Sequence, residues 1–169
     1  MRTTAMVGIL RCSHHINDKQ STIDIATQLI DNENVDSDIR NEALYCRGKV
    51  YLQDNQFGLA VVDFAPLAKE VRTAWGAEAK YQLAYCYFNL NAIDMAEQEI
   101  MSFTQLQTSH QYWLAKSFIV LGDSFAEREE WAQAKATFES VKEGYTPEKE
   151  HDDILEQVEL RLSKIVDYE

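Results

Sequence analysis

The chain has 169 residues, of which 46% are hydrophobic, and it has a formal net charge of −12 at pH 7. This length suits one compact domain or one short array of repeats. A surface this acidic repels the phosphate backbone of nucleic acids, so we expect no nucleic-acid partner. No stretch is long and apolar enough to cross a bilayer, so we expect no direct insertion into a membrane.

The composition favours helices over strands. With 6 Gly and 2 Pro, the chain has too few turn residues for an all-β fold, whereas residue types that favour helices are frequent. In chain order, the sequence predicts helices near residues 3–16, 19–32, 37–53, 56–71, 75–90, 92–105, 111–128, 130–144 and 149–167. Pro66 lies inside the fourth of these helices and should kink or shorten it, because proline lacks a backbone donor. Pro147 suits the start of the last helix.

A pattern of four positions recurs along these helices. A small residue is followed three positions later by an aromatic residue, twelve later by alanine and sixteen later by a large apolar residue. The clear copies are Gly48, Tyr51, Ala60 and Phe64; Ala84, Tyr87, Ala96 and Ile100; and Gly122, Phe125, Ala134 and Phe138. A weaker upstream copy has Ala26 and Ile30 in place, but His14 and Asn17 stand where the small and aromatic residues belong.

Each copy is long enough for two helices joined by a short turn. We expect the small residue and the alanine to permit close approach where the two helices cross. One helix pair cannot bury its apolar face alone, so successive pairs must stack. The last predicted helix has Leu155, Val158, Leu162 and Ile165 on one stripe, so it can cover the last pair with its acidic face outward.

These units resemble tetratricopeptide repeats over most of residues 3–145. The segments that carry the resemblance are LYCRGKVYLQDNQFGLAVVDF (44–64), KYQLAYCYFNLNAIDMAEQEI (80–100) and FIVLGDSFAEREEWAQAKATF (118–138). The resemblance implies an all-α domain over residues 1–169, a right-handed superhelix of stacked antiparallel helix pairs. Its units would span about 3–33, 37–72, 75–106 and 111–145, followed by a C-terminal capping helix at about 148–168. The chain departs from the family in its first unit, in slightly long later units and in lacking the usual proline at each unit's end.

The run from residue 76 onward also resembles the C-terminal part of long bacterial tetratricopeptide proteins, which would make Met1 an internal residue. If Met1 is the true start, we expect a cytoplasmic protein. A fragment of a longer exported protein could instead belong to the cell envelope or periplasm.

The reactive residue types do not form a catalytic or metal-binding pattern. Cys12, Cys46 and Cys86 are widely spaced, so we expect small buried apolar residues rather than disulfides or a zinc site. The adjacent His14 and His15 point in different directions on a helix and cannot hold one metal ion together. We therefore predict no enzyme activity, no cofactor and no metal site.

A row of aromatic and charged residues lies along the first helices of the pairs. In tetratricopeptide proteins the first helices line the concave side, so the resemblance implies a groove lined with tyrosine. The residues that we expect to face it are Arg11, His15, Glu42, Tyr45, Lys49, Tyr81, Tyr85, Phe88, Asn89, Lys116, Ile119 and Asp123. Tyrosine offers a large, rigid contact area with a polar tip, which suits an extended or helical peptide.

The predicted function is therefore protein–protein interaction, with a peptide or partner protein bound in this groove. In an alternative hypothesis, the aromatic residues only pack between repeats. The chain would then be a structural segment of a longer helical solenoid that contacts neighbouring domains or forms a homo-oligomer. A third hypothesis makes it a helical accessory domain of a catalytic protein. Binding of a chaperone's C-terminal tail is disfavoured, because the positions of the family's carboxylate clamp hold Arg11, His15, Cys46, Glu78 and Gln82.

Overall fold

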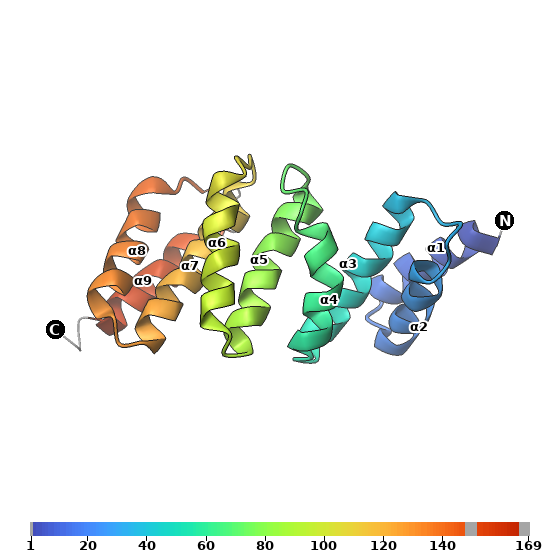
Figure 1. Ribbon diagram of the computed structural model, residues 1–169, viewed down its shortest axis with the longest axis horizontal. Helices are drawn as coiled ribbons and strands as arrows, with labels where there is room; N and C mark the ends of the chain where they lie inside the picture. The colour runs from blue at the N-terminus through green and yellow to red at the C-terminus, as the bar shows by residue number, and fades with distance from the viewer. Residues whose placement is uncertain (1, 148–151, 166–169) are drawn as a thin grey trace.

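The fold is all-helical, as the sequence predicts. The computed structural model describes residues 2–147 and 152–165. Within these ranges the helices are α1 (Arg2–His15), α2 (Lys19–Ile30), α3 (Ser37–Gln53), α4 (Phe57–Leu67), α5 (Ala74–Asn89), α6 (Ile93–Gln105), α7 (Gln111–Glu127), α8 (Trp131–Gly144) and α9 (Ile154–Ile165). They follow one another along the long axis of the molecule, with α1 at one end of the array and α8 at the other (Figure 1).

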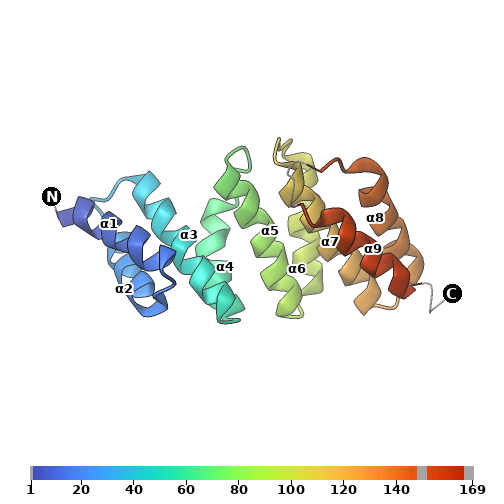
Figure 2. The same cartoon turned by 180° about the vertical axis from the view of Figure 1, so that it is seen from behind.

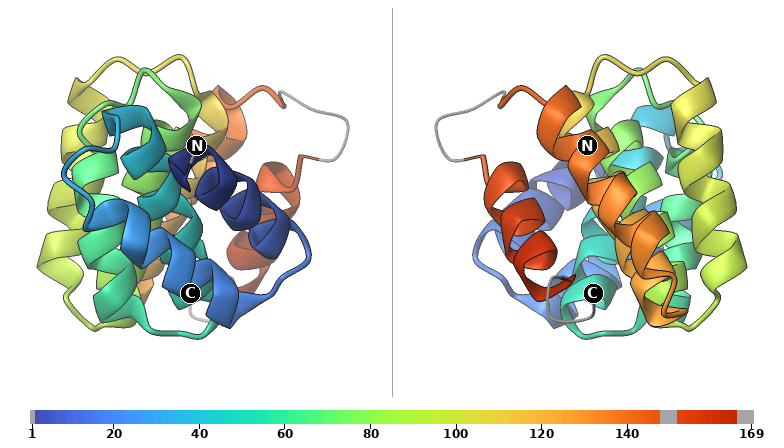
Figure 3. Two further views of the ribbon diagram at one scale, coloured as in Figure 1. Left: turned by 90° about the vertical axis from the view of Figure 1, so that its right-hand side faces the viewer. Right: turned by 90° about the vertical axis from the view of Figure 1, so that its left-hand side faces the viewer.

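Neighbouring helices pack in sequence order, from α1 against α2 to α8 against α9. The core is accordingly a series of apolar clusters, each shared by helices that are close in sequence, rather than one central cluster. The helix α9 also contacts α7, and it crosses in front of α7 in Figure 2. The end-on views in Figure 3 place α9 on the same side of the array as α1.

The same turn closes the first helix of every pair. One residue with positive φ stands in each of these turns: Asn17, Asn55, Asn91 and Glu129. The N–H of the residue that follows donates to the carbonyl oxygen five positions earlier, for example Gln56 to Tyr51 at 2.8 Å and Ala92 to Tyr87 at 2.9 Å. This left-handed helix ending satisfies carbonyl groups that a helix end otherwise leaves unpaired.

The turn also gives the register of the first pair, where the N–H of Asp18 donates to the carbonyl oxygen of Ser13 at 2.8 Å. Ser13 is therefore the equivalent of Tyr51, Tyr87 and Phe125. The four pattern positions of the first pair are Leu10, Ser13, Thr22 and Ala26. The predicted alignment on His14, Asn17, Ala26 and Ile30 is wrong by four residues, because it matched residue types without the turn that sets the register.

The first pair reverses the sizes at the helix crossing. Leu10 is large where the other pairs have a small residue, and Ala26 is small where they have a large one; both are fully buried. The aromatic position holds Ser13, whose hydroxyl donates to the carbonyl oxygen of Leu10 at 3.0 Å. The Thr22 hydroxyl donates to the carbonyl oxygen of Asp18 at 2.7 Å, so both buried hydroxyl groups are satisfied.

Close approach at the small residues is confirmed in the pairs that contain glycine. A Cβ atom on Gly122 would lie 2.4 Å from Cε1 of Phe138, and one on Gly48 would lie 3.0 Å from Cε1 of Phe64. Ala84 keeps its Cβ because the facing position holds the smaller Ile100. We call Leu10, Gly48, Ala84 and Gly122 the crossing positions.

Two predicted helix boundaries change. The predicted helix 56–71 is shorter in the structure, since α4 ends at Leu67, one residue after Pro66. The predicted helix 149–167 overlaps residues 148–151 and 166–169, which lie outside the described ranges, and α9 begins at Ile154. The buried stripe of α9 is Ile154, Val158 and Ile165, so its first member is Ile154 and not Leu155.

The size match at the crossing is testable. We expect Gly122→Ala to lower the free energy of unfolding by about 1–3 kcal/mol, because the Phe138 ring is buried and cannot move away. Adding Phe138→Ile recreates the Ala84 and Ile100 combination and should recover part of this loss in urea unfolding. Gly8→Ala is the control, since a Cβ there meets nothing within 4 Å; it should stabilise α1 by about 0.5–1 kcal/mol. A double variant no more stable than Gly122→Ala alone would contradict the size match.

Candidate functional site

The predicted site residues lie on the first helices of the pairs, α1, α3, α5 and α7. Successive first helices contact each other, and we call each such contact a join. The structure brings the predicted residues into two groups. One group lies around the α1–α3 and α3–α5 joins, and the other around the α5–α7 join and α9.

The first group is engaged in contacts within the chain. Arg11 donates through Nε and Nη2 to the two carboxylate oxygens of Glu42, at 2.6 and 2.8 Å. At the next join, Glu78 of α5 accepts hydrogen bonds from the Tyr45 hydroxyl at 2.8 Å and from Nζ of Lys49 at 2.7 Å. Burial and the Glu78 carboxylate raise the pKa of Tyr45. These polar side chains therefore connect neighbouring first helices.

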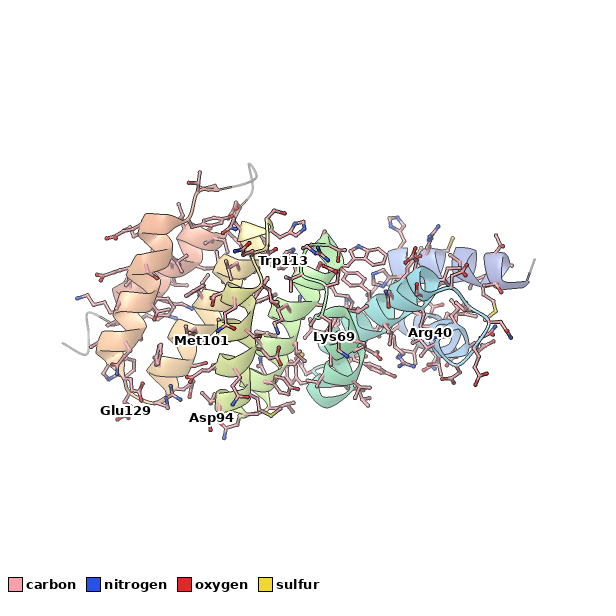
Figure 4. The ribbon with its side chains drawn as sticks, turned by 45° about the horizontal axis from the view of Figure 1, so that its top comes forward. Arg40, Lys69, Asp94, Met101, Trp113 and Glu129 are labelled. Carbon is pink, nitrogen blue, oxygen red and sulfur yellow. The ribbon has the colours of Figure 1, made fainter. Side chains whose placement is uncertain are left out.

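Tryptophans cover the tyrosines at two joins. The ring of Tyr45 stacks on that of Trp75, with centroids 5.2 Å apart and planes at 11°. The ring of Tyr81 stacks on that of Trp113 at 5.6 Å and 26°; Trp113 is labelled in Figure 4. Both tryptophans stand nine residues before a crossing position and both tyrosines three residues before one. The Tyr–Trp stack is therefore a repeated feature of the array.

The second group surrounds a hollow on α5, α7 and α9 with a volume of about 320 Å³. This volume is at the lower end of the range for ligand pockets, ~300–1,000 Å³. The hollow is lined by Tyr81, Tyr85, Phe88, Lys116, Ile119, Val120, Asp123, Gln157 and Arg161. The rings of Tyr81, Tyr85 and Phe88 are half-buried rather than enclosed.

One wall of the hollow is held in place by ion pairs that α7 forms with α9 and with Asp153, the residue directly before α9. Arg161 donates through Nε and Nη2 to the two carboxylate oxygens of Asp123, at 2.7 and 2.8 Å. Asp153 accepts a hydrogen bond from the Tyr112 hydroxyl at 3.0 Å and lies 3.5 Å from Nζ of Lys116. Burial alone would raise the pKa of Asp153, but the Tyr112 hydrogen bond and the Lys116 charge hold it below its usual value.

The hydroxyl groups of the hollow's tyrosines differ from those of Tyr45 and Tyr112. Within the described ranges, neither the Tyr81 nor the Tyr85 hydroxyl forms a hydrogen bond. Burial raises the pKa of Tyr81, so its hydroxyl remains a donor at neutral pH. Nζ of Lys116 lies 5.8 Å from the centroid of the Tyr81 ring and 5.2 Å from that of Tyr112.

Two predicted site residues stand apart from both groups. His15 is exposed at the end of α1. The side-chain amide of Asn89 donates to the carbonyl oxygen of Tyr85 in its own helix at 2.8 Å. Neither residue lines the hollow.

Several site residues were not predicted: Trp75, Trp113, Tyr112, Asp153, Gln157 and Arg161. The two tryptophans could have been found, because they occupy the same position in successive units. The residues of α9 had no such signal, because nothing in the repeat pattern indicates which surface the last helix covers.

The remaining chemistry of the described ranges is sparse. No group of three or more His, Cys, Asp or Glu side chains there is placed to hold a metal ion, and no helix among them meets the length and hydropathy needed to span a membrane. Cys46 and Cys86 are buried as predicted, and burial raises the pKa of their thiols to about 11 and about 12. Cys12 is exposed, so the prediction that it is buried is wrong.

Comparisons with known proteins add no family assignment. The chain matches no family model, no curated protein and no solved structure.

The Arg161–Asp123 pair should matter more for stability than an exposed pair. We expect Arg161→Ala to lower the free energy of unfolding by about 2 kcal/mol, because it leaves the partly buried Asp123 carboxylate without its bidentate partner. Arg72→Ala is the matched control, since that pair with Glu70 is exposed and exposed pairs contribute little. Equal urea midpoints for the two variants would show that the pair does not hold α9.

Proposed function

We propose that this chain is a protein-binding module of the tetratricopeptide type, a right-handed superhelix whose first helices form the binding face. A segment of a partner polypeptide would lie along α3, α5 and α7, with one side chain inserted into the hollow. The observation that carries the proposal is the hollow itself: half-buried aromatic rings beside unfilled space, with two phenol hydroxyls that have no partner within the described ranges.

The chemistry of the hollow supports a polypeptide ligand. Aromatic side chains supply contact area at a low cost in conformational entropy, because their rings have few rotatable bonds. The polar groups around the rings would fix the orientation of the segment. The buried apolar residues of α9 favour a permanent wall, since moving the helix would expose Ile154 and Val158, which are both fully buried.

A second candidate function rests on the outer face of α1. Ile9 is 49% exposed and Ile16, just beyond the helix, is 71% exposed. Ala5, Gly8 and Cys12 are also exposed on this helix. Exposed small and apolar residues of this kind suit contact with another helical unit, as in the structural segment of a longer solenoid or in a homo-oligomer.

Affinity capture with matched variants separates the two functions. We expect Tyr85→Ala/Phe88→Ala to lose at least tenfold of the partner captured from source-cell lysate by the wild type, because it removes two rings of the hollow. The control is Met95→Ala/Met101→Ala, which removes two exposed apolar residues from α6, where Met101 is labelled in Figure 4. The captured partner is then identified by mass spectrometry and titrated as a purified protein.

Equal binding of the partner by wild type and the Tyr85→Ala/Phe88→Ala variant would contradict the proposal. Loss of binding or of self-association in Ile9→Ser/Ile16→Ser alone would favour the second candidate function. Circular dichroism of each variant checks that its helicity is unchanged.

A further inference from the structure

The first two joins share one ion pair at equivalent positions. On the earlier helix of each join, the residue directly after the crossing position supplies one partner. On the later helix, the residue six positions before its own crossing position supplies the other. At the α1–α3 join these are Arg11 and Glu42, and at the α3–α5 join they are Lys49 and Glu78. In both cases the helix that comes earlier in the chain supplies the cation, and the later helix supplies the carboxylate.

The α5–α7 join departs from this pattern. Its equivalent positions hold Tyr85 and Lys116, so the carboxylate of the earlier joins is replaced by a cation. The change also affects the tyrosine three residues before the crossing position. At the α3–α5 join the Tyr45 hydroxyl donates to Glu78, whereas Lys116 has no acceptor to offer the equivalent hydroxyl of Tyr81.

The hydroxyl groups of the hollow that lack a hydrogen-bond partner are therefore donors, and a cation lies beside them. The Tyr81 and Tyr85 hydroxyls form no hydrogen bond within the described ranges, and Lys116 has an ion pair of 3.5 Å with Asp153. The carboxylate of the lining, Asp123, already accepts two hydrogen bonds from Arg161. Two cations and one carboxylate line the hollow, in a chain whose net charge is −12.

We propose that the hollow binds the carboxylate of an aspartate or glutamate side chain in the partner segment, next to a large apolar side chain that contacts Phe88. This inference rests on the proposed function and names its ligand. At the previous join Tyr45 and Lys49 both donate to the Glu78 carboxylate. The ligand carboxylate would accept from their counterparts, the Tyr81 and Tyr85 hydroxyls, beside the Lys116 cation that stands at the Glu78 position. Because that internal counterpart is a glutamate side chain, the ligand is an acidic side chain rather than a chain terminus.

The acidic surface of the whole chain does not prevent this binding. At physiological ionic strength, charges farther apart than about 8 Å are largely screened. The nearby donors therefore decide the affinity for the carboxylate, and the apolar neighbour adds burial against the aromatic rings.

The test is a selection from a display library of random dodecapeptides on the immobilised chain. Selected peptides are synthesised with acetylated and amidated ends, so that only side chains can supply a carboxylate, and are titrated by calorimetry. We expect enrichment of Asp or Glu beside Leu, Phe or Tyr. Replacing the acid in a selected peptide by Gln or Asn should weaken binding about tenfold, since one charge-assisted hydrogen bond contributes on the order of 1.5–3 kcal/mol.

Two variants of the chain complete the design. Lys116→Glu recreates the Glu78 arrangement, so it should accept the Tyr81 hydrogen bond and abolish binding of the acidic peptides. It also replaces the Lys116–Asp153 ion pair by two carboxylates, so its helicity and urea midpoint are compared with those of the wild type. Lys69→Glu makes the same charge change at an exposed residue just after α4 that does not line the hollow, and it should bind as the wild type does.

The outcomes distinguish this inference from the proposed function. Peptides that depend on Tyr85 but show no acidic enrichment, or that bind Lys116→Glu as well as the wild type, would overturn the carboxylate inference and leave the peptide-binding function standing. A selection whose peptides all bind Tyr85→Ala/Phe88→Ala unchanged, or that yields no binding peptide, would overturn both.

Discussion

The whole arrangement depends on the contact where the two helices of a pair cross. Two facing positions share a nearly constant space there, so a change of size at one is matched at the other. The combinations are Leu10 with Ala26, Gly48 with Phe64, Ala84 with Ile100, and Gly122 with Phe138. Because packed interiors tolerate neither a cavity nor an overlap, this match fixes how closely the helices approach and therefore how each pair stacks on the next.

The stacking in turn determines which side chains of successive first helices meet. The same turn ends α1, α3, α5 and α7, so residues at equal distances from the crossing position recur at equivalent places. This regularity produces the Tyr–Trp stacks and the ion pairs of the first two joins. The hollow lies where the regularity stops, since Lys116 replaces the acid of the earlier joins and α9 supplies a wall. A local departure from an otherwise consistent pattern is where a functional site is expected.

Much of this could be predicted from the sequence. The repeat indicated helix pairs in chain order, and the small residues indicated close crossings, as Gly48 and Gly122 show. Matching by residue type misaligns the first pair, because packing keeps the combined size of two facing residues and not the residue type at each position. Most of the predicted groove residues lie in the two groups of the site, but the sequence does not predict that α9 forms a wall of the hollow. Where α9 docks depends on its tertiary contacts through Asp153 and Arg161, which the spacing of its own apolar residues does not specify.

In the proposed complex a partner polypeptide contacts the hollow between α5, α7 and α9. Site-specific photocrosslinking tests it most directly, with benzoylphenylalanine placed at Phe88 in the hollow or at Met101 on the exposed face of α6. An aromatic ring already occupies position 88, so the probe disturbs the site little. We expect irradiation in source-cell lysate to join the position-88 probe to a defined partner and to leave the position-101 probe unlinked. The reverse result, or equal crosslinking at both positions, would contradict it.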